Sequence, residues 1–260
     1  MEFDFFKLHN SEEDKDLREC LRLYSVVPKF AKQTTEKEIL AERIVKILQS
    51  VNEKLKKENL DWKRKWIKTF SYSIAKRTVD DWFLGRASIP LFALQELKKF
   101  GCEKEVQEIM KNSEYFCSTT GKVFKLPPKL NPDLAWLVGA ILCDGHMHKL
   151  RHGVSFEVVD KILIIKFQNI FNAQFGVNVA YKNSKLREKR KQLYRFRVRC
   201  KPVVRFFEQF FEIPRGKKSH KIVVPQLILN SNIGIKKAFL IGVFDTDGGK
   251  RRNGLGLTSA

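Results

Sequence analysis

The segment 239-FLIGVFDTDGG-249 decides the fold, because 136-WLVGAILCDGH-146 repeats its design earlier in the chain. Both segments are apolar, both carry a glycine as their fourth residue, and both lead into Asp-Gly. The aspartates of these dipeptides, Asp144 and Asp247, are 103 positions apart (247 minus 144). An internal repeat can determine the architecture of a chain. We therefore predict two similar helices, each ending at a carboxylate.

A glycine within an apolar helix lets a second helix approach closer than the usual axis separation of ~8–10 Å. We expect Gly139 and Gly242 to lie at such an approach, so that the two helices pack side by side and their C-terminal ends coincide. Asp144 and Asp247 would then meet. Asp245 stays outside this predicted site, because a leucine takes its place in the first copy.

Two carboxylates at the negative ends of two helix dipoles repel each other unless a cation lies between them. Mg²⁺ suits such a pair, because it needs few protein ligands besides water and phosphate oxygens. Beside a basic surface the pair would suit phosphodiester hydrolysis, with the carboxylates as metal ligands rather than proton donors. The alternative is that each Asp-Gly only stops a helix and its carboxylate is solvated. The repetition favours the paired site.

The composition points to a polyanionic partner. The 260 residues include 50 Lys and Arg against 29 Asp and Glu, a formal net charge of +21. We expect this partner to be nucleic acid rather than a membrane, because the longest apolar run, Leu134 to Leu142, is far shorter than the ~20 residues of a spanning helix. The N-terminal end does not resemble a signal peptide. Five scattered cysteines without a Cys-x-x-Cys pair fit a reduced, intracellular protein of the cytoplasm or nucleoid.

The first part of the chain, 1–112, is predicted to be helical. Thr35 and Glu38 form a possible capping box for a helix that ends near Asn59, and further helices are expected over the segments 61–70, 73–86 and 88–101. The short basic helix with Lys76 and Arg77 resembles the second helix of a helix-turn-helix, which enters the major groove of DNA. The alternative is a plain helical bundle with solvated basic faces.

Prolines, glycine and hydroxyl residues over 113–130 predict a linker, followed by a second domain over 131–260. Its first unit, 131–230, is predicted to run helix, two strands, helix, two strands, helix. The expected elements are a hairpin over 146–159, a helix over 160–176, strands over 177–184 and 193–200, and a helix over 202–211. The second motif helix, 233–249, follows. The expected fold class is α+β, with an all-α first domain.

The segments 137-LVGAILCDG-145 and 240-LIGVFDTDG-248 resemble the paired motifs of LAGLIDADG homing endonucleases, in the dodecapeptide (DOD-type) form found in archaeal inteins. The stretch 213-IPRGKKSHKIVVP-225 is similar to a segment before the second motif of those proteins. The resemblance implies an αββαββα unit, whose four-stranded saddle straddles the major groove of double-stranded DNA. It also implies a divalent metal, Mg²⁺ or Mn²⁺, at the base of the helix pair. The implied ligands are Asp144, Asp247 and the backbone carbonyls of Cys143 and Thr246.

The predicted strand 193–200 presents arginine at every second position, and arginines on one sheet face suit phosphates and guanine edges. The alternative is a solvated edge strand guarded by charge. Three nearby histidines, at 146, 148 and 152, are expected on a polar surface rather than in a zinc site. The predicted DNA contacts of this domain are Arg195, Arg197, Arg199, Lys182, Lys185, Lys189, Arg190 and Lys191.

Only 249-GKRRNGLGLTSA-260 follows the second motif in this sequence, so we expect the second half of the saddle to be truncated. Three accounts stay open: a remnant that binds DNA without cutting it, a fragment of a longer protein, or a half-enzyme completed by a second chain. The predicted function is site-specific, metal-dependent cleavage of double-stranded DNA. The alternative is a non-cleaving DNA-binding protein or transcriptional regulator.

Overall fold

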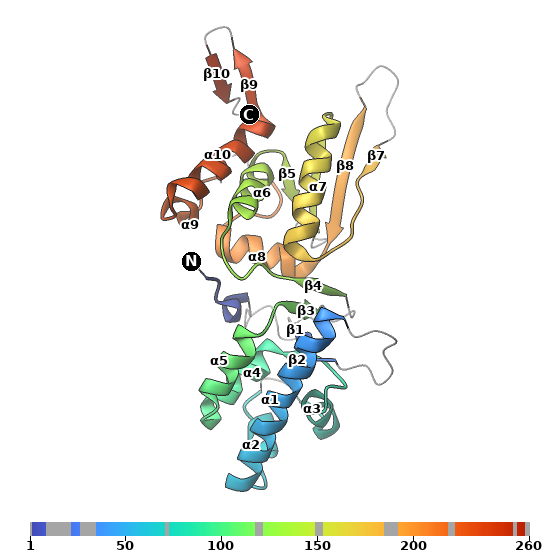
Figure 1. The fold of residues 1–260 in the computed structure, drawn as a ribbon, viewed down its shortest axis with the longest axis vertical. Coiled ribbons are helices and arrows are strands. Elements are labelled where there is room, and N and C mark those ends of the chain that lie inside the picture. Colours follow the sequence, from blue (N-terminus) through green and yellow to red (C-terminus); the bar gives the residue numbers. More distant parts are fainter. Residues whose placement is uncertain are drawn as a thin grey trace. The chain divides into compact units, whose positions relative to one another are not determined.

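The computed structural model describes residues 2–8, 22–26, 35–70, 73–117, 122–148, 153–184, 192–217, 222–251 and 254–257. For 249–251 and 254–257 only the backbone is described. The chain divides into two compact units (Figure 1). One unit is Asp4–Phe124, and the other is Lys125–Ala260 together with Met1–Phe3. The division falls inside the segment that we expected to be a linker.

The first unit is built around α1 (Glu36–Glu58), whose start and end agree with the sequence prediction. The backbone N–H of Thr35 donates to the Glu38 carboxylate at 2.7 Å, and Asn59 caps the other end. Apolar residues at helical spacing form one buried stripe. Its members are Ala41, Ile44, Val45, Leu48, Val51 and Leu55.

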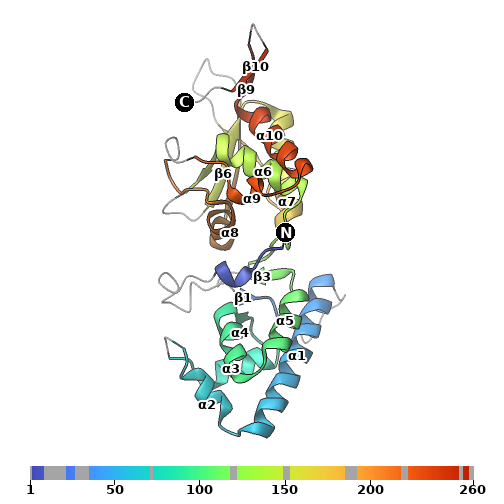
Figure 2. The ribbon, with the colours of Figure 1, turned by 90° about the vertical axis from the view of Figure 1, so that its left-hand side faces the viewer.

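Shorter helices lie beside α1 (Figure 2). They are α2 (Trp62–Ile67), α3 (Lys76–Phe83), α4 (Leu91–Leu97), the 3-10 helices η1 (Phe5–Leu8) and η2 (Lys98–Phe100), and α5 (Glu103–Lys111). An aromatic cluster joins α2 to α3: the ring of Trp66 lies 6.1 Å from that of Trp82 and 5.7 Å from that of Phe83. Gly85 follows α3 with a φ of 67°, which ordinary residues rarely adopt, and so ends the helix.

The first unit is not all-α, because it also contains a small sheet that the sequence did not predict. The strands pair in the order β2-β1-β3-β4, and are β1 (Arg22–Leu23), β2 (Ile89–Pro90), β3 (Tyr115–Cys117) and β4 (Val123–Lys125). Two strands are only two residues long, too short for an alternating pattern to be visible. The Ser25 hydroxyl, which accepts from the N–H of Ile89 at 3.2 Å, helps to join segments that are distant in the sequence.

The second unit has the predicted order of elements, which confirms the α+β class. These elements are α6 (Pro132–Cys143), β5 (Gly145–Met147), β6 (Gly153–Val158), α7 (Lys161–Phe175), β7 (Lys182–Ser184), β8 (Leu193–Arg199), α8 (Lys201–Phe211), α9 (Gln226–Leu229), α10 (Ile233–Asp247), β9 (Gly248–Arg251) and β10 (Gly254–Leu257). The four strands of the αββαββα part form one antiparallel sheet in the order β5-β6-β8-β7. The last two strands form a separate antiparallel pair after α10.

The predicted strand over 177–184 was too long, since only its last three residues are a strand. Side chains of α7 bind the preceding backbone instead. The Asn172 amide bonds both the N–H and the C=O of Val179, at 3.2 and 3.0 Å, and Gln168 accepts from the N–H of Tyr181 at 2.7 Å. These backbone groups therefore have partners without joining the sheet.

The core of the second unit lies between the sheet and the helices α7 and α8. The ring of Phe156 on β6 stacks on Phe167 of α7 with centroids 4.2 Å apart, and Phe196 of β8 lies 5.4 Å from Phe167. On α8, Phe206 and Phe207 extend this cluster and are fully buried. Within the described parts of the chain, we find no helix that is long and apolar enough to cross a membrane. The aromatic core fixes one face of the sheet against α7. The opposite face of the sheet carries polar side chains.

Candidate functional site

The two motif helices, α6 and α10, lie side by side (Figures 1 and 2) and cross in close contact at their glycines. A Cβ atom added to Gly139 would lie 2.4 Å from the carbonyl oxygen of Phe239, and one added to Gly242 would lie 2.2 Å from that of Trp136. These two contacts are equivalent under the 103-residue repeat, because Trp136 and Phe239 occupy the same motif position. The two helices are therefore related by a local two-fold pseudosymmetry at their crossing point.

Both helices begin after an asparagine, although Asn131 and Asn232 are 101 positions apart (232 minus 131) rather than 103, so α10 has two more residues before its glycine. At their starts, Asn131 accepts from the N–H of Leu134 at 2.8 Å, and Asn232 accepts from the N–H of Ile235 at 3.0 Å. Each asparagine thereby satisfies one of the free N–H groups of a first helical turn.

At the other ends, Asp144 caps α6 and Asp247 is the last residue of α10. The glycine that follows each aspartate fits where no side chain would. A Cβ atom on Gly145 would lie 2.5 Å from the Cα atom of Ile141, and one on Gly248 would lie 2.3 Å from the carbonyl oxygen of Phe244. The chain thus folds back over the last helical turn in both copies, and Asp-Gly is a requirement of that turn.

The predicted backbone ligands occupy the same last turns. Cys143 is the final residue of α6 and is half-buried. The Thr246 hydroxyl donates within α10 to the carbonyl oxygens of Gly242 and Val243, both at 3.0 Å. Within the residues described, no group of three or more His, Cys, Asp or Glu side chains is placed to hold a metal ion. Two carboxylates with backbone carbonyls are a hard oxygen donor set, which fits Mg²⁺ or Mn²⁺ completed by water.

Asp245 lies two residues before Asp247 and bonds to two other helices of the second unit. Its Oδ2 atom accepts from the indole N–H of Trp136 and from Nζ of Lys166, each at 2.8 Å. Lys166 also lies over the Trp136 ring, with Nζ 4.4 Å from the centroid. Asp245 therefore ties α10 to α6 and α7. No local pattern predicts this contact, because its three residues come from three separate helices.

The polar face of the sheet lies opposite the aromatic core. Three arginines of β8 project from it: Arg195 and Arg199 are exposed and Arg197 is half-buried, whereas the alternate residues Phe196 and Val198 are buried. Lys182 of β7 is exposed and lies directly across from Arg195. Four further predicted DNA contacts, Lys185, Lys189, Arg190 and Lys191, lie outside the described residues, as does His152.

Arg195 forms an ion pair across the strands. Its Nε lies 2.7 Å from Oε1 of Glu157 on β6, and its Nη2 lies 3.1 Å from Oε2. Nearer β5, the rings of His146 and His148 are 4.6 Å apart, and Nε2 of His148 lies 3.0 Å from the Ser155 hydroxyl. The histidines belong to this polar face.

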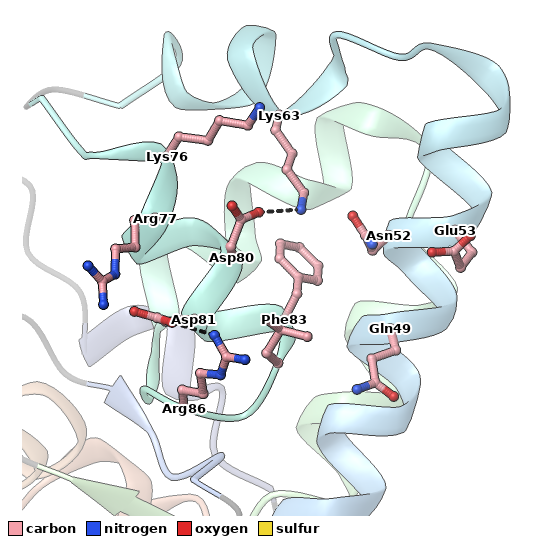
Figure 3. A pocket seen from close by; sticks show the side chains of 11 residues that line it. Gln49, Asn52, Glu53, Lys63, Lys76, Arg77, Asp80, Asp81, Phe83 and Arg86 are labelled. Carbon is pink, nitrogen blue, oxygen red and sulfur yellow. Dashed lines mark hydrogen bonds and ion pairs between the residues drawn. The ribbon is translucent and has the colours of Figure 1, made fainter.

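In the first unit, Lys76 and Arg77 begin α3 and are exposed. They line a groove of about 820 Å³ between α1, α2 and α3. Two ion pairs line this groove: Lys63 of α2 pairs with Asp80 of α3 at 2.7 Å, and Arg86 pairs with Asp81 at the end of α3 at 3.7 Å (Figure 3). The other lining residues are Gln49, Asn52, Glu53, Phe83 and Leu84. The helix-turn-helix assignment of this unit stays a prediction.

Comparison with known proteins agrees with this geometry. Residues 131–210, from α6 to α8, match the family model of the LAGLIDADG-like domain. The chain is also similar to the replication factor C small subunit of Methanocaldococcus jannaschii, with 29% identity over 132 residues, 50% of this chain. The similar region spans only 7% of that protein's length. A LAGLIDADG-like domain indicates a nuclease or DNA-binding role, and endonucleases of this family generally use divalent metals. Residues 131–210 therefore form a LAGLIDADG-like domain.

Proposed function

We propose that this protein binds double-stranded DNA and hydrolyses its phosphodiester bonds at the C-terminal ends of α6 and α10, as a site-specific endonuclease of the homing type. The observation that carries the proposal is the pseudosymmetric crossing of the two helices through Gly139 and Gly242. Two related catalytic ends suit a substrate with two related strands. Asp144 and Asp247 occupy equivalent positions at those ends.

In this proposal Asp144 and Asp247 hold a divalent ion, together with the backbone carbonyls of Cys143 and Thr246. When bound, the ion lowers the pKa of water and stabilises the leaving oxygen of the phosphodiester. The aspartates act as ligands and not as acids. Gly145 and Gly248 support them, because any larger residue would push the chain off the last helical turn and displace the adjacent carboxylate.

The polar face of the sheet supplies the DNA contacts. Arg197, Arg199 and Lys182 belong to it. The predicted contacts Lys185, Lys189, Arg190 and Lys191, which lie outside the described residues, are proposed to act with them. Basic side chains that contact phosphates give affinity for DNA but do not select its base sequence. In the first unit, Lys76 and Arg77 are proposed to contribute a second DNA contact. A chain that acts on DNA in this way would work in the cytoplasm, at the nucleoid.

The outer face of α10 carries exposed apolar side chains, which a further unit would cover. Leu240, Ile241 and Phe244 are 47%, 51% and 38% exposed. Their equivalents in α6, Leu137, Val138 and Ile141, are fully buried. We propose that a second αββαββα-like unit, on a partner chain or on a longer form of this one, covers α10 as the sheet and α7 of this chain cover α6. It would complete the DNA-binding saddle.

Cleavage of a randomised double-stranded DNA library in Mg²⁺ tests the proposal. Wild-type protein is compared with Asp144→Asn and Asp247→Asn, which keep the side-chain size but remove the charge. Asp133→Asn is the matched control, because Asp133 is an exposed carboxylate in the first turn of α6, far from the site. We expect the two site variants to lose metal-dependent cutting while binding DNA normally, and the control to cut as the wild type does.

A second candidate function is DNA binding without cleavage, as in a transcriptional regulator. It is favoured by the exposed outer face of α10, which the described elements of the chain leave uncovered. The same experiment separates the two functions. Binding without metal-dependent cutting, unchanged by the aspartate substitutions, would rule out the nuclease and favour the regulator.

A further inference from the structure

Glu157 is an acidic residue on the face of the sheet that we propose to meet DNA. A carboxylate there opposes binding of a polyanion, so its presence calls for a specific role. Glu157 lies on β6 directly across from Arg195 of β8, and both side chains project away from the aromatic core. They are 37% and 44% exposed. An exposed ion pair of this kind contributes little to stability.

The geometry of the ion pair is bidentate. Glu157 receives one bond from Nε and one from Nη2 of Arg195, at 2.7 and 3.1 Å. The carboxylate therefore occupies the side of the guanidinium group and holds its plane in one orientation. The outer edge, formed by Nη1 and the second N–H of Nη2, points away from the carboxylate. That edge carries two parallel donors, which match the O6 and N7 acceptors of guanine in the major groove.

We infer that Arg195, held in orientation by Glu157, reads a guanine base in the DNA target. Arg195 is the specificity-determining residue of the pair, and Glu157 is its positioning residue. The inference rests on the proposed binding of double-stranded DNA by this sheet. Arg199 provides a contrast on the same strand and face, because its cross-strand neighbour is Gly153, which has no carboxylate to orient it. Arg199 is assigned to phosphate contact.

Selection of binding sites from a random double-stranded DNA library, carried out without divalent metal so that nothing is cut, tests the inference. Wild-type protein should select guanine at one position, by a factor on the order of 10 to 100 over other bases. Arg195→Lys keeps the charge but loses the planar pair of donors, so the guanine preference should vanish. Arg199→Lys should leave the preference intact.

Glu157→Gln distinguishes a positioning role from a purely structural one. The substitution removes a negative charge from the DNA-facing surface, so affinity for random DNA should rise. It also weakens the hold on Arg195, so the guanine preference should fall several-fold. These opposite changes would support the inference. Full guanine preference in Glu157→Gln, or equal loss of preference in Arg195→Lys and Arg199→Lys, would overturn it. A wild-type protein that binds DNA with no base preference would overturn it as well, whereas failure to bind any DNA would overturn the proposed function itself.

Discussion

The close crossing of α6 and α10 predicts that Gly242→Ala disrupts the helix pair. The added Cβ atom would lie 2.2 Å from the carbonyl oxygen of Trp136, whereas ordinary contacts begin at 3.4 Å. The helices would have to separate locally by 1.2 Å, the difference between these distances. Overpacking of a close interface costs about 1–3 kcal/mol, and the better helix propensity of alanine returns up to about 1 kcal/mol. We expect a net loss of roughly 1–2 kcal/mol.

Hydrogen exchange of the full chain, followed by mass spectrometry, measures this loss where it occurs. Peptides from 132–143 and 233–247 should exchange roughly 5 to 30 times faster in the variant, since 1.4 kcal/mol corresponds to a factor of ten. Gly234→Ala is the matched control in the same helix. Its Cβ atom would meet only the Asn232 side chain, at 3.3 Å, and alanine favours the helix, so exchange should stay the same or become slower, not faster. The double variant with Gly139→Ala should lose less than the sum of the single losses, because both changes open one crossing. Wild-type protection of both helices in Gly242→Ala would refute the reasoning.

Three further predictions concern stability and reactivity. Asn232→Ala removes the acceptor for the N–H of Ile235 and should cost about 1 kcal/mol, seen as faster exchange in the first turn of α10. The hydrogen bond from Lys54 lowers the pKa of Glu105, so this pair stabilises the fold above pH ~4.3 and loses that effect as the pH falls through the lowered value. Thermal unfolding of Lys54→Met should therefore depend less on pH in this acidic range than that of the wild type. Burial raises the pKa of the Cys102 thiol, so iodoacetamide at neutral pH should leave it unmodified until the protein unfolds.

The repeated motif and the order of elements in the second unit were predictable, because each depends on signals that lie within one segment. The apolar runs give helix length, Asp-Gly marks the helix ends, and alternation of Arg195 and Phe196 along β8 gives the two faces of the strand. Asn131 and Asn232 also stand at recognisable N-cap positions, although the prediction did not use them.

What could not be predicted depends on residues that are distant in the sequence. Pairing of Arg195 with Glu157 requires the register between β6 and β8, and a shift of one residue would place Glu157 on the other face. The small sheet of the first unit pairs Leu23 with both Ile89 and Phe116, and none of these short segments has a strand pattern of its own. Such contacts are determined by tertiary packing, to which local propensity gives little guide.

Asp245 shows why the second copy of the motif departs from the first. The equivalent position in α6 is Leu142, which is buried and held by packing. The helix α10 is covered on one side only, and an apolar side chain at 245 would add to the exposed surface already formed by Leu240 and Phe244. Asp245 instead accepts hydrogen bonds from Trp136 and Lys166, which fasten α10 to α6 and α7 without needing cover from outside. An aspartate at position 245, in place of the leucine of the first copy, therefore suits this helix pair. Its bonds within the chain hold α10 and Asp247 in place, whether or not a further unit covers the helix.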